Sequence, residues 1–232
     1  MQTLLAAPYK AVLFDMDNTL FDFIGAMQRG SAAAAEFLQA GTGEELFSYY
    51  LRWKHHVEDH TNLQDFMIAH DCFSVEKYFA AVEAYDSAMH AGLTAYEGVH
   101  ELLTSLKADG YKLGIVTDAF AHGAEKRLAV TNLSEYFDVV VSYDMTGYKK
   151  PHHEPFECAL SLLECAPHDV LYVGDSIRRD IEPAYAVGMT PVYAKYGDRN
   201  FFETKFSTEI PPKTLVAESP LDILRILQET ML

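Results

Sequence analysis

The sequence is poor in cysteine, and its three cysteines form no recognisable set. Cys72, Cys158 and Cys165 are an odd number, and their spacing matches no pattern of metal ligands. Disulfides persist in oxidising compartments, and stable frameworks of them pair cysteines in even numbers. We therefore expect three reduced thiols in a cytoplasmic protein.

Basic residues are also scarce, and long apolar runs are absent. The chain holds 18 lysines and arginines against 34 aspartates and glutamates, which gives a formal net charge of −16. Such a charge repels a phosphate backbone and an anionic lipid surface, so we expect neither a nucleic acid nor a membrane as partner. No run of about 18 apolar residues, the length that spans a bilayer, occurs. The first residues lack the basic start and apolar stretch of a signal peptide.

Apolar residues are nevertheless plentiful, at 49% of a chain of 232 residues, which is enough for a packed core. Short apolar runs predict strands at residues 9–15, 112–117, 137–141, 170–173 and 191–194 and near 215–216. Helical segments separate the later strands, at residues 99–108, 125–131, 155–163, 180–187 and 220–228. This alternation predicts an α/β fold with a parallel sheet and helices on both of its faces.

The stretch between the first strand and the rest has helical periodicity and no strand signal. We predict helices at residues 25–40, 44–59, 63–69 and 74–89. The chain is therefore expected to consist of an α/β core, made of residues 1–20 and 94–232, and an inserted helical domain at 21–93. On the predicted second helix Arg52 and Lys54 are two residues apart, so they should not point the same way. His56 and His60 are four apart there, a spacing that can bind zinc, but no third ligand accompanies them.

The first strand runs directly into two aspartates. The apolar residues 11–14 precede Asp15 and Asp17, whose side chains leave an extended backbone on the same side. Two neighbouring carboxylates repel each other unless a cation lies between them, and oxygen ligands suit Mg²⁺. The alternative is a polar turn in which Asp and Asn side chains stabilise a local bend.

Polar groups follow three further predicted strands. Thr117 and Asp118 follow the second, Lys150 follows the third after a short loop, and Asp175 follows the fourth, with Asp180 five residues on. Ligands of open α/β sheets bind at the carboxyl ends of the strands, where such groups meet. Each residue alone has a plainer explanation: Thr117 as a loop cap, Lys150 as a surface lysine, Asp180 at a helix start.

Taken in order, these stretches closely resemble the four motifs of the haloacid dehalogenase superfamily of phosphatases, over nearly the whole chain. The matching residues are Asp15-Met16-Asp17-Asn18-Thr19, then Thr117, then Lys150-Pro151 with Phe156, and then Gly174-Asp175-Ser176 with Asp180. One position departs from the pattern, because His153 stands where members often have a second proline. The resemblance implies a Rossmann-like core with a helical cap, and a small soluble phosphomonoester as substrate.

The resemblance also implies roles for these residues. Asp15 would attack phosphorus to give an aspartyl-phosphate, and Asp17 would act as general acid and then as general base. Mg²⁺ would be held by Asp15, the backbone carbonyl of Asp17 and Asp175. Thr117 and Lys150 would bind phosphoryl oxygens. Asp180 would orient Lys150 or a metal-bound water. Asp118 is expected to support and orient the same groups, and its plainer alternative is a cap for backbone donors.

Length and motif form are similar to glyceraldehyde 3-phosphate, phosphoglycolate and acylneuraminate 9-phosphatases. Between residues 21 and 94 the chain has four basic residues against eleven acidic ones, which favours a small monophosphate such as a triose or sugar phosphate. A phosphoglycolate phosphatase, a phosphomutase and a non-catalytic binding protein of the same fold are alternatives. Asp17 argues against a dehalogenase, and we expect a monomer or homodimer.

Overall fold

The computed structural model describes residues 9–52, 54–199 and 210–230. It divides into two compact units, one made of Met1–Asp22 with Ala95–Leu232 and the other of Phe23–Thr94. No helix among the described residues is long and apolar enough to cross a membrane.

The first unit is built on a parallel sheet of six strands in the order β3-β2-β1-β4-β5-β6. The strands are β1 (Ala11–Phe14), β2 (Lys112–Val116), β3 (Val139–Val141), β4 (Val170–Gly174), β5 (Thr190–Ala194) and β6 (Leu215–Ala217). β1 and β4, at the centre, are buried along their whole length, which explains why both are continuous apolar runs. The predicted α/β fold is confirmed.

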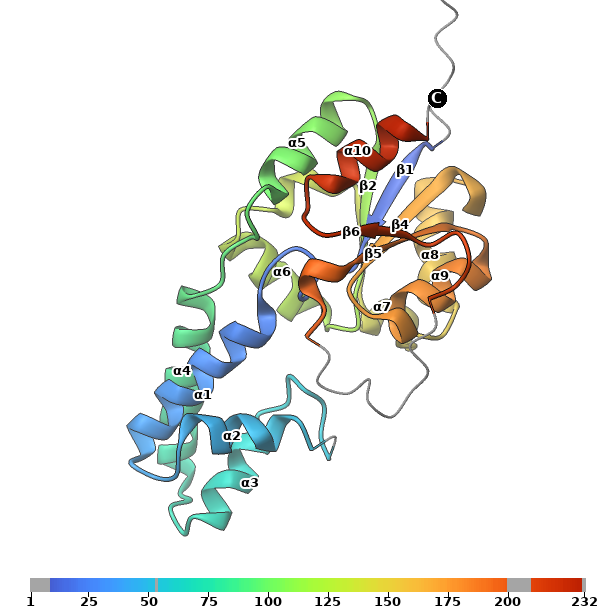
Figure 1. Cartoon of the computed structure of the whole chain (residues 1–232). Coiled ribbons are helices and arrows are strands. Elements are labelled where there is room, and N and C mark those ends of the chain that lie inside the picture. Colours follow the sequence, from blue (N-terminus) through green and yellow to red (C-terminus); the bar gives the residue numbers. More distant parts are fainter. Residues whose placement is uncertain (1–8, 53, 200–209, 231–232) are drawn as a thin grey trace, which may run out of the picture. The chain divides into compact units, whose positions relative to one another are not determined.

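Helices cover both faces of this sheet (Figure 1). The α-helices of this unit are α5 (Val99–Ala108), α6 (Ala121–Val130), α7 (Tyr143–Thr146), α8 (Glu154–Leu163), α9 (Glu182–Val187) and α10 (Asp222–Glu229). α5 packs on β2 and α10, whereas α8 packs on β2, β3 and α9. Phe156 of α8 lies against Tyr172 of β4, with ring centroids 4.9 Å apart, in the core under α8.

The second unit contains four helices: α1 (Phe23–Leu38), α2 (Gly43–Tyr50), α3 (Thr61–Ala69) and α4 (Val75–Ala91). Thr42 and Ser74 cap α2 and α4, because each side chain accepts a bond from a backbone N–H three residues on. α1 and α4 pack closely because Gly30 has no side chain: a Cβ there would lie 2.9 Å from the Tyr85 carbonyl oxygen. Tyr50 stacks on Tyr85 with centroids 5.1 Å apart.

The expected helix at 44–59 is wrong in its second half, because α2 ends at Tyr50. Beyond it Arg52 and Lys54 leave irregular backbone and both reach Asp65 Oδ2, at 3.1 and 2.7 Å. They therefore point the same way, contrary to expectation. His56 and His60 do not share a helix either, and Trp53, also placed on that helix, lies outside the described residues.

Three further differences concern the first unit. α6 begins at Ala121, four residues before the expected start, and the short helix α7 was not expected. The two are linked, since the Ala121 backbone N–H donates to Asp144 of α7 at 2.8 Å. The expected helix at 180–187 is a π-turn, Ile177–Ile181, followed by α9.

Candidate active site

The register of the sheet brings the polar strand ends together. Phe14, the last residue of β1, pairs with Ile115 of β2 on one side and with Val173 of β4 on the other. The segments that follow β1, β2 and β4 therefore leave the sheet side by side, at its carboxyl edge. Asp15 and Asp175 lie at that edge and both are buried.

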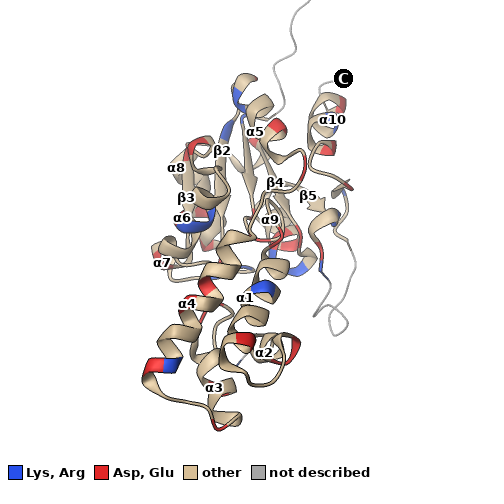
Figure 2. Cartoon of the chain, turned by 90° about the vertical axis from the view of Figure 1, so that its left-hand side faces the viewer, with Lys and Arg blue, Asp and Glu red and all other residues tan. Residues whose placement is uncertain are grey.

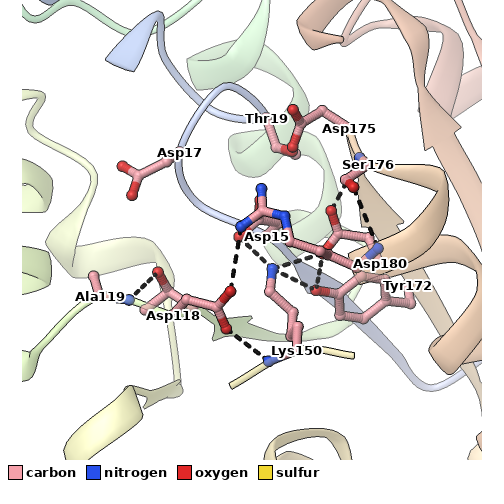
Figure 3. Close-up of polar contacts among 12 residues, drawn as sticks. Asp15, Asp17, Thr19, Asp118, Ala119, Lys150, Tyr172, Asp175, Ser176 and Asp180 are labelled. Atoms are coloured by element: carbon pink, nitrogen blue, oxygen red, sulfur yellow. Dashed lines mark hydrogen bonds and ion pairs between the residues drawn. The ribbon is translucent and has the colours of Figure 1, made fainter. Parts of the chain in front are cut away.

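Lys150 is the centre of the resulting cluster (Figure 3). Its Nζ atom lies 2.6 Å from Asp15 Oδ1, 2.6 Å from Asp180 Oδ1 and 3.3 Å from the Tyr172 hydroxyl oxygen. The Lys150 backbone N–H donates to Asp118 Oδ1 at 2.8 Å. Lys150 is thus an interior group rather than a surface lysine, while neighbouring Lys149 lies over the ring of Tyr143.

Burial and charge oppose each other at Lys150. Burial lowers the pKa of the ammonium group, but the carboxylates of Asp15, Asp180 and Asp118 outweigh it and hold the pKa above its ordinary value. Burial also raises the pKa of Asp175 well above its ordinary value, and the charges of Asp15 and Asp180 add to the rise. The site therefore holds a permanent cation beside crowded carboxylates.

This crowding fits a metal ion. One carboxylate oxygen from each of Asp15, Asp175 and Asp180 lies within 4.8 Å of the others, and all three residues are buried. Thr19 Oγ1 donates to Asp175 Oδ1 at 3.4 Å. An all-oxygen donor set of this kind suits a hard divalent cation such as Mg²⁺. The carboxylate of Asp17 is not one of these three. Asp17 was predicted to contribute its backbone carbonyl to the metal site and not its side chain.

Asp180 reaches Lys150 because Gly174 leaves room for it. A Cβ at Gly174 would lie 2.5 Å from the Asp180 Cβ atom. The Ser176 backbone N–H donates to Asp180 Oδ2 at 3.0 Å, and the Ser176 hydroxyl accepts from the Arg179 N–H at the start of the π-turn. Glycine and serine in this motif thus shape the turn that delivers Asp180.

Asp118 joins the loop after β2 to the π-turn. One of its oxygens accepts from the Lys150 backbone, as a capping role requires, and the other lies 3.2 Å from Arg179 Nη1. Thr117 is buried, and its hydroxyl oxygen accepts from the Ala119 N–H at 3.2 Å. The structure therefore places Thr117 at the same edge, with its hydroxyl bonded to its own loop.

Asp17 lies apart from the other predicted residues. Its carboxylate points away from the cluster around Lys150 (Figure 3). Arg127 of α6 lies beside it, with Nε 3.2 Å from Asp17 Oδ1. The loop that carries Asp17 is fixed from the other side by Tyr196, whose hydroxyl donates to the Thr19 carbonyl oxygen at 2.9 Å.

Sequence reasoning missed four side chains of this site: Tyr172, Arg127, Arg179 and Tyr196. Tyr172 sits inside a strand and Arg127 inside a helix, so neither follows a motif. A polar hydroxyl in the buried run Val170–Gly174 and an arginine at an inward position of α6 were the available signals. To read either signal, one must know which residues the strand or the helix packs against.

Known proteins match both the sequence and the fold. A model of the haloacid dehalogenase-like hydrolase family matches residues 12–194. The pyrophosphatase PpaX of Bacillus mycoides is 32% identical over an alignment of 178 residues, and the match covers 71% of this chain and 74% of that protein. A putative β-phosphoglucomutase from Thermotoga maritima has a similar structure, with a TM-score of 0.75 at 25% sequence identity. The alignment covers 95% of this chain and 99% of that one. The magnesium-bound putative HAD-hydrolase YfnB of Bacillus subtilis shares the fold at 20% sequence identity, with a TM-score of 0.74. That alignment also covers 95% of this chain and 99% of the other.

Proposed function

Because the chain belongs to the haloacid dehalogenase-like hydrolases and is a phosphatase, we propose that it hydrolyses a small phosphorylated metabolite through an aspartyl-phosphate on Asp15. The observation that carries the proposal is the position of Asp15 at the end of β1, with Lys150 Nζ 2.6 Å from its Oδ1 atom. A carboxylate beside a buried cation can receive a phosphoryl group whose charge the cation offsets.

In the first step an Asp15 oxygen forms a bond to phosphorus while the ester P–O bond breaks. The departing alkoxide takes a proton from Asp17 and leaves as an alcohol. Lys150 and Thr117 bind the phosphoryl oxygens, where charge spreads in the transition state. For Thr117 this requires its hydroxyl to donate to phosphate, which is compatible with accepting from the Ala119 N–H, since a hydroxyl does both.

In the second step Asp17 takes a proton from a water molecule, whose oxygen attacks the phosphorus of the aspartyl-phosphate. The bond between phosphorus and Asp15 breaks, so inorganic phosphate leaves and the Asp15 carboxylate is restored. One water is consumed for each ester cleaved. Asp180 keeps Lys150 in place through both steps, supported by the 2.6 Å contact between them.

Asp15, the backbone carbonyl of Asp17 and Asp175 are the proposed holders of Mg²⁺, and Asp180 supports them. When bound, the ion offsets the repulsion between the anionic nucleophile and the anionic phosphate. The raised pKa of Asp175, caused by burial and by the charges of Asp15 and Asp180, supports a cation at this place.

The proposed substrate is a monophosphate whose remainder is neutral or singly charged, such as a triose or sugar phosphate. The Phe23–Thr94 unit, which we propose acts as a cap that excludes water, carries many acidic residues on its helices and few basic ones (Figure 2). Two of its basic residues, Arg52 and Lys54, are already engaged by Asp65. A polyanionic leaving group would meet like charge there.

Pyrophosphate is a second candidate, because the PpaX sequences that resemble this chain are pyrophosphatases by name. The core chemistry would be the same, with phosphate in place of an alcohol as leaving group. A pyrophosphatase would need cations for the second phosphoryl group, and Arg179, whose side chain is 33% exposed, is one at this edge of the sheet.

A phosphate-release screen distinguishes these candidates. Glyceraldehyde 3-phosphate, phosphoglycolate, glucose 6-phosphate, fructose 1,6-bisphosphate and pyrophosphate would be compared by kcat/KM under one Mg²⁺ condition. We expect a monophosphate to rank first, and activity to vanish with excess chelator and return with Mg²⁺ or Mn²⁺. A clear preference for the bisphosphate or for pyrophosphate would contradict the charge argument, and full activity in chelator would contradict the metal assignment.

A further inference from the structure

Arg127 is a charged side chain at a position where its helix otherwise buries apolar residues. The other buried members of α6 are Ala124 and Leu128. Only 3% of the Arg127 side chain is exposed. Taking a guanidinium out of water is costly unless charged and hydrogen-bonding partners offset the cost. An apolar side chain of similar volume would fill the space without that cost, so packing alone does not account for an arginine here.

One partner of Arg127 is the side chain to which we assign proton transfer. Arg127 Nε lies 3.2 Å from Asp17 Oδ1, and 22% of the Asp17 side chain is exposed. The pair therefore joins a buried cation to a carboxylate that is partly exposed. A buried guanidinium has little room to move, so it holds the carboxylate that pairs with it near one place.

The direction in which the Asp17 carboxylate points suits a group that donates a proton to the leaving oxygen. Its carboxylate points away from Asp15 and Lys150 (Figure 3). In phosphoryl transfer the attacking and leaving oxygens lie roughly in line on opposite sides of phosphorus, so the acid must stand apart from the nucleophile. Asp15 and Asp180, by contrast, both contact the ammonium group of Lys150.

We propose that Arg127 is a positioning residue that holds the Asp17 carboxylate apart from Lys150 and on the side of the leaving oxygen. The inference rests on the proposed function, in which Asp17 passes its proton to the alkoxide as the ester P–O bond breaks. Arg127 acts through Asp17 and does not touch the substrate. Its loss therefore slows the transfer of that proton and leaves the attack by Asp15 in place.

Two substrates of different leaving group separate this role from a structural one. An alkyl monophosphate leaves as a strongly basic alkoxide that needs a proton, whereas p-nitrophenyl phosphate leaves as a stabilised phenolate that does not. The alkyl probe is whichever of glyceraldehyde 3-phosphate, phosphoglycolate and glucose 6-phosphate the unaltered enzyme turns over best. For Arg127→Met we expect kcat/KM on the alkyl probe to fall at least about tenfold more than kcat/KM on p-nitrophenyl phosphate.

The ratio of the two values does not depend on how much of the variant is folded, because both are measured on one sample. Lys126→Met removes an exposed cation from the same helix and should leave the ratio unchanged. Arg127→Lys keeps the charge without the planar fork and should shift the ratio in the same direction by a smaller factor, so it carries the test if Arg127→Met does not fold.

An equal fall on both substrates, or no fall, in the Arg127 variants would overturn the inference and leave the proposed function standing. If the unaltered enzyme releases phosphate from none of the probes, the proposed function is refuted, and the inference with it.

Discussion

At Lys150 one ammonium group serves two carboxylates. A lysine has three rotatable donors and a flexible stem, so its charge alone has no fixed direction. The contacts to Asp180 and the Tyr172 hydroxyl, at 2.6 and 3.3 Å, fix two of the directions inside the core. The remaining direction is toward Asp15. The proposed phosphate-binding role of Lys150 therefore depends on side chains that never touch the substrate.

Gly174→Ala tests that dependence. The added Cβ would lie 2.5 Å from Asp180 Cβ, so Asp180 must shift and its contact with Lys150 must lengthen. Because small misplacements of catalytic groups are costly, we expect kcat to fall about a hundredfold in a folded variant, measured by phosphate release.

Gly110→Ala is the matched control for Gly174→Ala. At Gly110 an added Cβ meets nothing within 4 Å, but φ is +84°, so alanine there is strained without touching the site. We expect it to lower stability by about 1–2 kcal/mol and to leave kcat unchanged. Unaltered kcat in a folded Gly174→Ala enzyme would contradict the role given to Asp180.

The elements that the sequence predicts well are those whose pattern of apolar residues matches the surfaces that they bury. Val170–Gly174 is an uninterrupted apolar run because both faces of β4 are covered, and α5 has the predicted bounds because its four buried residues follow helical spacing. The parallel order then places the ends of β1, β2 and β4 at one edge, so the location of the site follows from the strands and the motifs together.

The elements that it predicts poorly depend on contacts from elsewhere in the chain. α2 ends at Tyr50, although the sequence continues with Trp53 at helical spacing. The Tyr50 hydroxyl contacts His60 Nδ1 at 3.3 Å. The early start of α6 depends on Asp144, more than twenty positions away. Arg127 is paired with Asp17, in a loop more than a hundred positions earlier in the sequence. Periodicity carries no information about such partners.

The end of α2 also creates a cluster of side chains with a pH-dependent effect on stability. The hydrogen bond from Lys54 lowers the pKa of Asp65 most, and the bond from His55 adds to it, so together they outweigh burial and hold the pKa below its ordinary value of 3.8. Since the folded pKa lies below the unfolded one, the stabilisation is present above about pH 3.8 and is lost as the pH falls through the folded value.

We therefore expect Asp65→Asn to lower the melting temperature at neutral pH, by an amount that shrinks as the solution is acidified below pH 3.8. Thermal unfolding followed by circular dichroism at a series of pH values measures this difference. Asp71→Asn, which removes a carboxylate from the loop after α3, is the matched control. A difference that stayed constant into strong acid would show that the Asp65 charge adds no stability.

On the scale of the whole molecule, an acidic chain buries three carboxylates, those of Asp15, Asp175 and Asp180, at one place. The chain carries a net charge of −16, and these three groups are buried within 4.8 Å of one another. Burial and the charges of Asp15 and Asp180 raise the pKa of Asp175, so its ionised form costs stability at neutral pH. A cation bound there would offset the repulsion between these carboxylates and would stabilise the folded chain by mass action.

Asp175→Asn should therefore have opposite effects with and without metal. In chelator we expect its melting temperature to exceed that of the unaltered protein, by roughly 2–4 °C for each kcal/mol of repulsion removed. With Mg²⁺ added, the unaltered protein should gain stability and the variant should not. Differential scanning fluorimetry across a Mg²⁺ series measures both. Equal gains in the two proteins would show that the ion binds elsewhere.

The central claim is that Asp15 is the nucleophile. Its most direct measurement is to mix enzyme with substrate, quench with acid within the first turnover, digest the protein and locate the phosphoryl group by mass spectrometry. We predict an acid-stable, hydroxylamine-labile acyl phosphate on Asp15, and its absence from Asp15→Asn together with a loss of phosphate release greater than about a thousandfold. A phosphoryl group on another residue, or near-normal turnover by folded Asp15→Asn, would contradict the account.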